Sequence, residues 1–331
     1  MTSCGTETRQ HWMDFARSVC ILLVIFLHTT TAMQKYGVPF PDYIAVFNQF
    51  MDPFRIPLLM FLSGMLLERS LAKPNREYLV GKFNLIFWPF LIWSQAIYAA
   101  DGRLTLEYIL KTPITAPSVL WYLWFLCAYY LIGLVLARRR VPLVPVMIVC
   151  LVLSGLLPDY MRMDRFAALL MFFLLGHYVV TKRFSMQGRG ALALVGLGLA
   201  IVGGLISVLY GTIKYDPLFV WVPMGLIAFL LWAAPHYERS AVTGAFEWIG
   251  RNSIVFYAAH FPLLLVGTRL GETYTEAAGA VFCAVLFLVA LILCAFLQIL
   301  RRRWAPATAL FDFAVAWRLV RGLTGKAAPV S

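Results

Sequence analysis

Long apolar segments follow one another along almost the whole chain, with short connectors between them. Ten of them approach the length that crosses the roughly 30 Å hydrocarbon core of a bilayer. They are residues 17–34, 48–68, 82–100, 119–137, 141–157, 165–181, 190–211, 217–234, 250–268 and 277–300. Because a lipid-exposed segment must satisfy its own backbone hydrogen bonds, apolar spans of this kind fold as helices. The sequence therefore predicts an all-α, polytopic integral membrane bundle of about ten transmembrane helices.

The composition and the placement of charge agree with this fold class. Hydrophobic residues make up 61% of the chain and charged residues only 13%, whereas a soluble domain carries about 25% charged residues. The net charge of +12 does not indicate nucleic acid, because basic residues concentrate in alternate connectors such as 138–140 and 301–303. This bias follows the positive-inside rule. It predicts a lipid bilayer as partner, no nucleic acid, and both termini in the cytoplasm.

No linker or internal repeat divides the apolar part of the chain. We therefore expect one transmembrane domain over residues 1–303 and a cytoplasmic tail over 304–331, formed either as an interfacial amphipathic helix or as a frayed end. The missing repeat weakens the interpretation of the chain as a transporter built from inverted repeats. The acidic Glu7 and Asp14 before the first span, with no prompt small-x-small cleavage site, favour a retained helix over a signal peptide.

The first span carries two polar residues that an apolar helix does not need. Arg17 and His28 are eleven residues apart, a rotation within about 20° of three full turns, so both lie on nearly one helix face. They are separated by roughly 16 Å along the axis. With Arg17 at the cytoplasmic boundary, His28 lies near the middle of the bilayer, where a polar group is costly and indicates function.

His28 and Arg17 each have a functional and a structural interpretation. His28 can act as a general base near neutral pH, or it can be a core histidine bonded to a threonine or the backbone. Arg17 can hold a phosphate or carboxylate, or it can extend to the membrane surface. Asp14, one turn earlier, is interpreted as the ion-pair partner of Arg17 and as a helix-start residue. His28, Arg17 and Asp14 together are the candidate catalytic residues.

A second polar group lies in the segment from Phe54 to Gly64. Arg55, near the outer boundary, is a candidate for contact with an anionic or hydroxyl-rich substrate. Ser63 is a candidate substrate contact as well. The pair of small residues that it forms with Gly64 also suits close helix packing, and both interpretations remain open.

A third group lies in the ninth span. Ser253, Tyr257 and His260 follow the spacing i, i+4, i+7, so they share one helix face and are candidate substrate-binding residues. This span runs in the same direction as the first, which places His260 about as deep as His28. The two histidines are therefore candidates for one shared cavity, although depth alone does not decide it.

Aromatic residues open the fourth span. Trp121 and Trp124 are either belt residues at the membrane interface or an aromatic platform for a sugar ring. The cysteines show no CxxC pair and no metal-like spacing with histidine, so no metal site and no bound cofactor are expected. The chain also lacks the glycine motifs of nucleotide hydrolases and the GxSxG of serine hydrolases.

At these residues the chain resembles the acyltransferase-3 family of integral membrane O-acyltransferases, which modify bacterial surface and secreted glycans. The likeness covers nearly the whole chain. It rests on Arg17-x10-His28 preceded by Asp14, the FRIPLLMFLSG segment, Lys82 followed by Pro89 and Trp93, the WYLWFL segment, and IGRNSIVFYAAH ending at His260. The closest likeness is to sugar O-acetylases that act on exopolysaccharide or nodulation-factor sugars.

The resemblance implies that Arg17 and His28 are required and that the donor is acetyl-CoA or another acyl-CoA from the cytoplasm. It places Lys82 at a donor-binding position, where family members often have more arginines than this chain does. It also implies an enzyme of the bacterial inner membrane whose acceptor is a glycan or a lipid-linked sugar. The polysaccharide-assembly machinery is then a candidate partner.

We therefore expect a membrane O-acyltransferase that moves an acyl group, taken to be acetyl, onto a glycan hydroxyl. The alternative is a transporter or flippase whose buried His and Arg line a substrate path. A third hypothesis is a non-catalytic scaffold of a polysaccharide complex, for which His28 would be dispensable.

Overall fold

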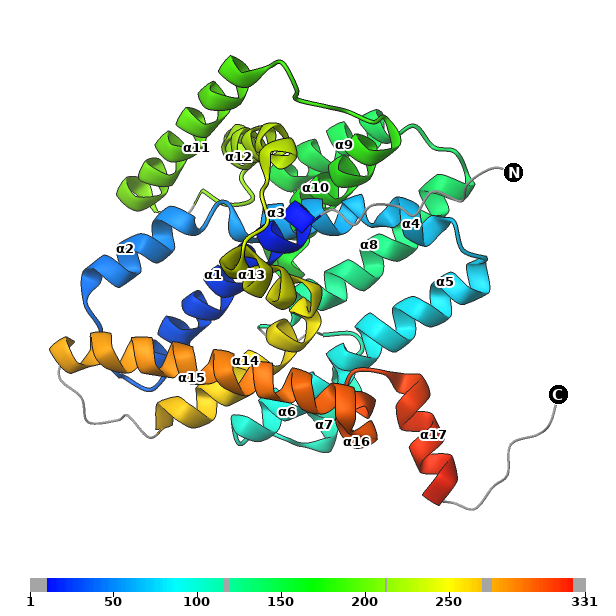
Figure 1. The fold of residues 1–331 in the computed structure, drawn as a ribbon, viewed down its shortest axis with the longest axis vertical. Coiled ribbons are helices and arrows are strands. Elements are labelled where there is room, and N and C mark those ends of the chain that lie inside the picture. The colour runs from blue at the N-terminus through cyan, green and yellow to red at the C-terminus, as the bar shows by residue number, and fades with distance from the viewer. Residues whose placement is uncertain (1–10, 116–118, 212, 270–275, 324–331) are drawn as a thin grey trace.

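The computed structural model describes residues 11–115, 119–211, 213–269 and 276–323, four of them by their backbone only (Met161, Glu276, Ala277 and Leu323). Within these residues all regular structure is helical and no strand occurs, which confirms the all-α prediction (Figure 1). The sequence predicts one domain over residues 1–303 and a tail over residues 304–331. The first ten residues of that domain and residues 324–331 of the tail lie outside the described residues.

The helices follow one another with short connections. In chain order they are α1 (His11–Lys35), α2 (Asp42–Met51), α3 (Arg55–Met65), α4 (Leu67–Leu71), α5 (Asn75–Lys82), the π-helical turn η1 (Phe83–Phe87), α6 (Trp88–Ala100), α7 (Leu106–Lys111), α8 (Trp121–Arg138), α9 (Leu143–Leu156), η2 (Tyr160–Arg162), α10 (Met163–Thr181), α11 (Gly190–Tyr210), η3 (Pro217–Phe219), α12 (Trp221–Ala233), η4 (Ala234–His236), α13 (Ala241–Arg251), α14 (Ser253–Thr268), α15 (Glu276–Arg303), α16 (Ala305–Ala309) and α17 (Phe313–Leu323).

The count of membrane spans differs slightly from the predicted ten. Eight helical stretches in the described part of the chain are long and apolar enough to cross a bilayer, or nine if the bent pair α13–α14 is one span. The predicted fifth span forms α9, which has only 14 residues and at 1.5 Å per residue is shorter than the hydrocarbon core. The bundle is polytopic as expected, but one of its helices is short and another is broken.

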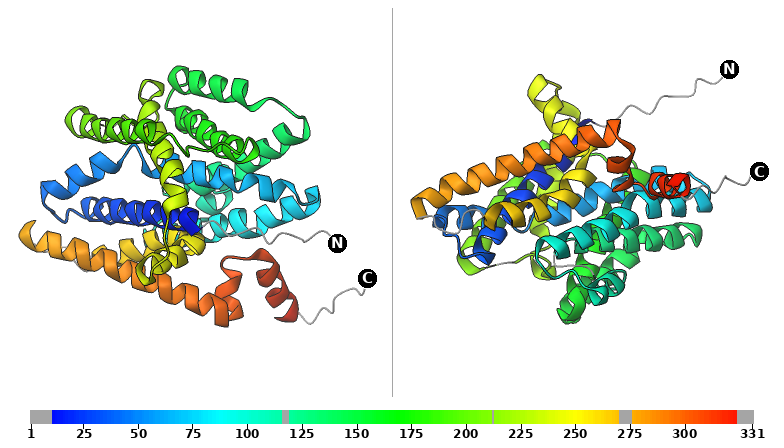
Figure 2. Two further views of the ribbon diagram at one scale, coloured as in Figure 1. Left: turned by 45° about the horizontal axis from the view of Figure 1, so that its top comes forward. Right: turned by 90° about the horizontal axis from the view of Figure 1, so that it is seen from below.

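Helix α1 lies inside the bundle and contacts α3, α13, α14 and α15. Figures 1 and 2 show α11 and α12 on one side of α1 and α15 on the other. The approach of α13 is close because Gly250 faces the backbone of α1: a Cβ there would lie 1.8 Å from the carbonyl oxygen of Asp14. The first span is thus enclosed by partners that also carry polar residues.

Helices α3 and α10 also pack closely in the core. A Cβ at Gly64 would lie 1.8 Å from the carbonyl oxygen of Phe173, and one at Gly176 would lie 2.0 Å from that of Phe61. These reciprocal glycines let the two backbones touch, which is how small residues pack membrane helices. The close helix contact expected at Gly64 is therefore present.

The described part of the tail folds back onto the third span. The ring of Phe313 in α17 packs on Phe83 and Trp88, with ring centroids 5.2 and 5.0 Å apart. The indole nitrogen of Trp88 donates a hydrogen bond of 2.7 Å to the carbonyl oxygen of Ala309. The tail thus contains a helix, and its position at a membrane interface stays a prediction.

Candidate functional site

Helices α1 and α14 bring His28 and His260 into direct contact. The Nδ1 atom of His28 lies 2.7 Å from Nε2 of His260, and the two rings are nearly parallel, 7° apart, with centroids 5.0 Å apart. His260 is fully buried, while His28 is half-buried. The shared depth expected from the sequence is thus a hydrogen-bonded pair of imidazoles.

The surroundings of the pair fix which nitrogen of each ring carries a proton. Nδ1 of His260 lies 3.0 Å from the carbonyl oxygen of Phe256, and because a carbonyl only accepts, this nitrogen is the donor. No described carboxylate forms an ion pair with either ring, and a buried unpaired charge is costly, so both imidazoles are assigned as neutral. Nε2 of His260 then accepts from Nδ1 of His28. This leaves Nε2 of His28 as an acceptor whose lone pair is free of hydrogen bonds within the described residues.

Arg17 points from α1 toward α3 and α8. Its guanidinium donates a hydrogen bond of 3.2 Å to the carbonyl oxygen of Leu62, and its charge interacts with the nearby Tyr122 and Tyr130. Asp14 is buried one turn earlier, where α1 meets α13. Arg17 is half-buried, and its hydrogen bond to Leu62 directs the guanidinium toward α3.

Ser63 belongs to a cluster of hydroxyl groups between α3 and α8. Its Oγ donates to the carbonyl oxygen of Leu59 at 2.8 Å and accepts from the hydroxyl of Tyr122 at 3.0 Å. The hydroxyl of Tyr130 donates to the carbonyl oxygen of Ser63 at 3.2 Å. Sequence reasoning missed both tyrosines; their spacing of eight residues, which places them on one helix face, was the available signal.

Aromatic contacts connect this cluster to the histidine pair. The rings of Tyr122 and Tyr257 lie 5.1 Å apart, and those of Tyr257 and His260 lie 5.9 Å apart. The Tyr257 hydroxyl donates to the carbonyl oxygen of Val119 at 2.7 Å. Tyr257 and His260 therefore share one face of α14, as the spacing predicts.

Ser253, the third residue of that predicted face, lies at the break between α13 and α14. The two helices are bent by 77° there, so the straight ninth span expected from residue 250 does not form. Asn252 holds the break: its amide donates to the carbonyl oxygen of Trp248 at 2.7 Å and its Oδ1 accepts from Gln298 at 2.6 Å. Ser253 begins α14 one turn before Tyr257, and its substrate contact stays a prediction.

Lys82 lies on the other side of Tyr130. Its Nζ is 3.5 Å from the centroid of the Tyr130 ring and donates to the Ser70 hydroxyl at 2.9 Å. A π-helical turn follows immediately at Phe83–Phe87, and such turns are frequent at functional sites. The two predicted donor-binding residues, Arg17 and Lys82, are therefore grouped around Tyr130.

Arg55 is buried, with 2% of its surface exposed. Its guanidinium donates to Oδ1 and the carbonyl oxygen of Asn48, at 3.0 and 2.8 Å, and to Asp52 at 3.0 Å. The Asn48 amide in turn donates to the Thr30 hydroxyl at 3.1 Å, two residues after His28. These bonds connect α2 and α3 to the helix that carries His28. They favour a supporting position for Arg55, and its contact with a substrate stays a prediction.

The two tryptophans of α8 occupy different surroundings. Trp124 donates from its indole nitrogen to the carbonyl oxygen of Pro113 at 3.0 Å. Trp121 contacts Tyr215, with ring centroids 6.5 Å apart, and lies beneath the Arg162 guanidinium at 5.8 Å. Only Trp121 therefore lies among charged and aromatic groups suited to a polar ligand.

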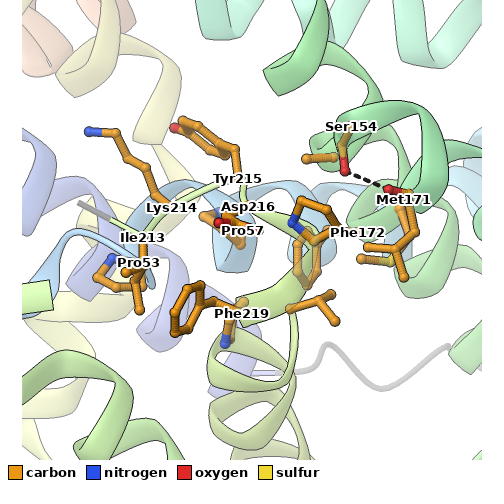
Figure 3. A pocket seen from close by; sticks show the side chains of 15 residues that line it. Pro53, Pro57, Ser154, Met171, Phe172, Ile213, Lys214, Tyr215, Asp216 and Phe219 are labelled. Carbon is orange, nitrogen blue, oxygen red and sulfur yellow. Dashed lines mark hydrogen bonds between the residues drawn. The ribbon is translucent and has the colours of Figure 1, made fainter. Parts of the chain in front are cut away.

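Tyr215 belongs to a short segment before η3. Figure 3 shows its side chain and that of Lys214 projecting to one side of this segment, away from Phe219. The small cavity drawn there, about 20 Å³, has room for about one water molecule. This cavity is too small for a substrate. A substrate contact would therefore involve the surface at Tyr215 rather than the cavity.

Comparisons with known proteins show which family the chain resembles. The family model described as an acyltransferase domain (Acyl_transf_3) matches residues 10–299. The inner membrane protein YcfT of Escherichia coli (strain K12) is 24% identical over 182 residues, which are 46% of this chain and 51% of that protein. The match thus spans about half the length of this curated relative. No solved structure matches the chain.

Proposed function

Because the chain belongs to the acyltransferase-3 family, whose model covers residues 10–299, we propose that it transfers an acyl group, acetyl in the simplest case, from a cytoplasmic acyl-CoA to a hydroxyl of a surface or secreted glycan or its lipid-linked precursor. The observation that carries this proposal is the free lone pair on Nε2 of His28. It follows from the 2.7 Å contact with His260 and the 3.0 Å contact of His260 with Phe256. A neutral imidazole held in one tautomer is ready to act as a general base.

In the proposed reaction, Nε2 of His28 removes the proton of the acceptor hydroxyl as its oxygen attacks the thioester carbonyl. A carbon–oxygen bond forms, and the carbon–sulfur bond breaks as the tetrahedral intermediate collapses. The CoA thiolate leaves and takes the proton back from His28, which regenerates the neutral base. The protein adds no oxidant, metal or bound cofactor in this scheme; acyl-CoA acts only as a donor substrate.

Arg17 and Lys82 are proposed to bind the phosphate end of the donor. Both lie near Tyr130, and Arg17 is roughly 16 Å from His28 along α1. An extended pantetheine arm can cover such a distance, so phosphates at Arg17 would let the thioester reach His28. At that distance Arg17 would bind the donor without taking part in the transfer itself.

The proposed membrane topology places Arg17 toward the cytoplasm and both termini on that side, following the loop charges. A multi-pass location in the inner membrane agrees with the eight or nine spans and with the name of the relative YcfT. The acceptor would then approach His28 from the opposite side or from a lipid-linked intermediate. This division of sides leaves a path for each substrate.

A His28→Ala variant tests the proposal. Purified protein in detergent should release CoA from acetyl-CoA when acceptor is added, and the variant should lose this activity because no base remains. We expect a decrease of about a hundredfold or more, together with loss of the acyl mass from the glycans of cells that carry the variant.

His177→Ala is the matched control, because His177 is also a buried membrane histidine but lies on α10. It should keep its activity. Normal glycan acylation by correctly inserted His28→Ala protein would remove the catalytic role of His28. A wild-type protein that moves glycans without releasing CoA would instead support the flippase alternative.

A further inference from the structure

Four elements meet at the start of α8 and form a surface on the acceptor side of the histidine pair. Arg162, at the end of η2, covers the ring of Trp121 with its guanidinium carbon 5.8 Å from the ring centroid. Tyr215 contacts the same indole. Arg162 also lies close enough to Tyr215 and to Tyr257 of α14 to interact with both electrostatically. Because Tyr257 contacts the ring of His260, this surface is one aromatic ring away from the histidine pair.

Arg162 is the cation of this surface that forms no ion pair in the described segments, although the carboxylate of Asp159 attracts it electrostatically. Its neighbour Arg165 forms an ion pair with Asp159 at 3.0 Å, and Lys214 forms one with Asp52 at 2.8 Å. The guanidinium of Arg162, by contrast, makes no hydrogen bond or ion pair with any side chain in the described segments. The group is half-buried, and burial, followed by the charge of Arg165, lowers the pKa of Arg162. An anion bound there would stabilise the charged form.

The backbone at this surface is strained in two places. Arg162 has φ = 60° and Tyr215 has φ = 70°, in the left-handed region that is unfavourable for a residue with a Cβ. Both of these residues contact the one indole of Trp121. Strained residues occur preferentially at ligand sites, where the surrounding structure holds them in place. Here the two strained residues, Arg162 and Tyr215, both contact Trp121.

We propose that Arg162, Trp121 and Tyr215 form an acceptor subsite for an oxyanion, a carboxylate or phosphate group of the glycan substrate. The planar guanidinium binds two oxygens of such a group at once, and the two aromatic rings supply apolar walls for the sugar. This inference rests on the proposed acyltransferase function and assigns the acceptor class: a glycan that carries negative charge near the hydroxyl to be acylated. Such charge comes from a uronic acid or from the phosphates of a lipid carrier.

The test compares three acceptors that share one oligosaccharide: a neutral form, a form with a uronic acid, and a form bearing a lipid diphosphate. Wild-type, Arg162→Gln and Arg162→Lys proteins are purified in detergent and assayed for CoA release. Arg162→Gln should raise the KM for a charged acceptor about ten- to a hundredfold. The kcat, the KM for acetyl-CoA and the KM for the neutral acceptor should stay unchanged. Lysine should restore part of the affinity, since it keeps the charge without the planar fork.

Arg269→Gln is the matched control, because Arg269 also lies over a tyrosine ring, 5.6 Å from the centroid of Tyr36, but contacts none of the three residues of this surface. It should change the KM values little. The charged acceptor that responds to Arg162→Gln identifies the source of the oxyanion, uronic acid or diphosphate. Equal KM values in wild type and Arg162→Gln for both charged acceptors, or an equal loss with the neutral one, would overturn the subsite.

A binding measurement separates this inference from the proposed function. The uronic-acid oligosaccharide is titrated against each protein by intrinsic tryptophan fluorescence, with no donor present. Weaker binding of this oligosaccharide to Arg162→Gln than to wild type would support the subsite. It would do so even if the wild-type protein released no CoA, a result that would refute the acyltransferase proposal. If phosphatidylglycerol binding alone weakens in the variant, Arg162 holds a lipid headgroup and the subsite is wrong.

Discussion

His260 uses both of its ring nitrogens within the protein, one toward the carbonyl oxygen of Phe256 and one toward His28. A ring with no free nitrogen has no acceptor left for a substrate proton. The sequence suggested His260 as a substrate-binding residue, and that role remains untested. The contacts favour a positioning role, in which His260 holds the tautomer and plane of the neighbouring base.

His260→Ala should therefore lower kcat about ten- to a hundredfold, the range typical of residues that orient a functional imidazole, with little change in KM for donor or acceptor. Steady-state CoA release measures both constants. Added imidazole, which fits the space left by the ring, should restore part of the kcat, and His177→Ala should behave like wild type. A raised KM at unchanged kcat would support substrate binding instead.

For single residues, the sequence shows which polar side chains lie in apolar spans, but it does not show which groups those side chains contact. Arg17, His28, Tyr257 and His260 were found because polar groups in apolar spans stand out. Tyr122 was overlooked beside Trp121 and Trp124, since the rotation of α8 about its axis decides which ring faces Ser63. That rotation depends on packing against other helices, which an apolar stretch does not reveal.

The pairing of α3 with α10 shows how whole helices are positioned. Gly64 and Gly176 each meet a backbone carbonyl of the other helix, so neither position has room for a methyl group. Because Ser63 lies beside Gly64 and bonds to Tyr122, a shift of α3 would also displace the hydroxyl cluster. Packing and site geometry therefore depend on the same contact.

Gly64→Ala should destabilise the protein by about 1–3 kcal/mol, the usual cost of forcing extra atoms into a packed core, and should reduce activity as α3 moves. Thermal unfolding in detergent, followed by the fraction that remains monodisperse, measures the change. Gly198→Ala in α11 is the control, because a Cβ there meets no atom within 4 Å. Equal unfolding temperatures for the two variants would show that α3 and α10 are not tightly packed.

The break between α13 and α14 was not predictable from hydropathy. Residues 250–268 are apolar enough to suggest one straight span, and Asn252 alone is a weak signal. The bend is stabilised by the bond from Gln298, a residue 46 positions later in the sequence. A contact between residues so far apart in the sequence depends on the tertiary fold. The composition of a single span does not reveal it.

On the scale of the whole molecule, charged connectors join the ends of the spans. Asp101, directly after α6, forms ion pairs with Lys35 at the end of α1 and with Arg103. Burial tends to raise the pKa of this carboxyl group, but the hydrogen bonds from Lys35 and Arg103 outweigh it and hold the pKa of Asp101 below its usual value. The pair thus joins the helix that carries His28 to the third span.

The stabilisation from Asp101 should depend on pH. A carboxyl group with a lowered pKa stabilises the folded state fully above its ordinary value of about 3.9 and loses this contribution as the pH falls through the lowered value. Asp101→Asn should therefore unfold at a lower temperature than wild type at pH 7, and the difference should shrink under strongly acidic conditions. Melting curves from pH 7 downward measure it. A difference independent of pH would point to lost packing instead.

The pairing of His28 with His260 joins residues 232 positions apart in the chain, and this has a consequence for synthesis in the cell. Helix α1 enters the membrane early, with its histidine unpartnered until α14 has also been inserted. The proton-accepting site therefore does not exist during most of translation. The proposed transfer would therefore begin only when α14 folds against α1.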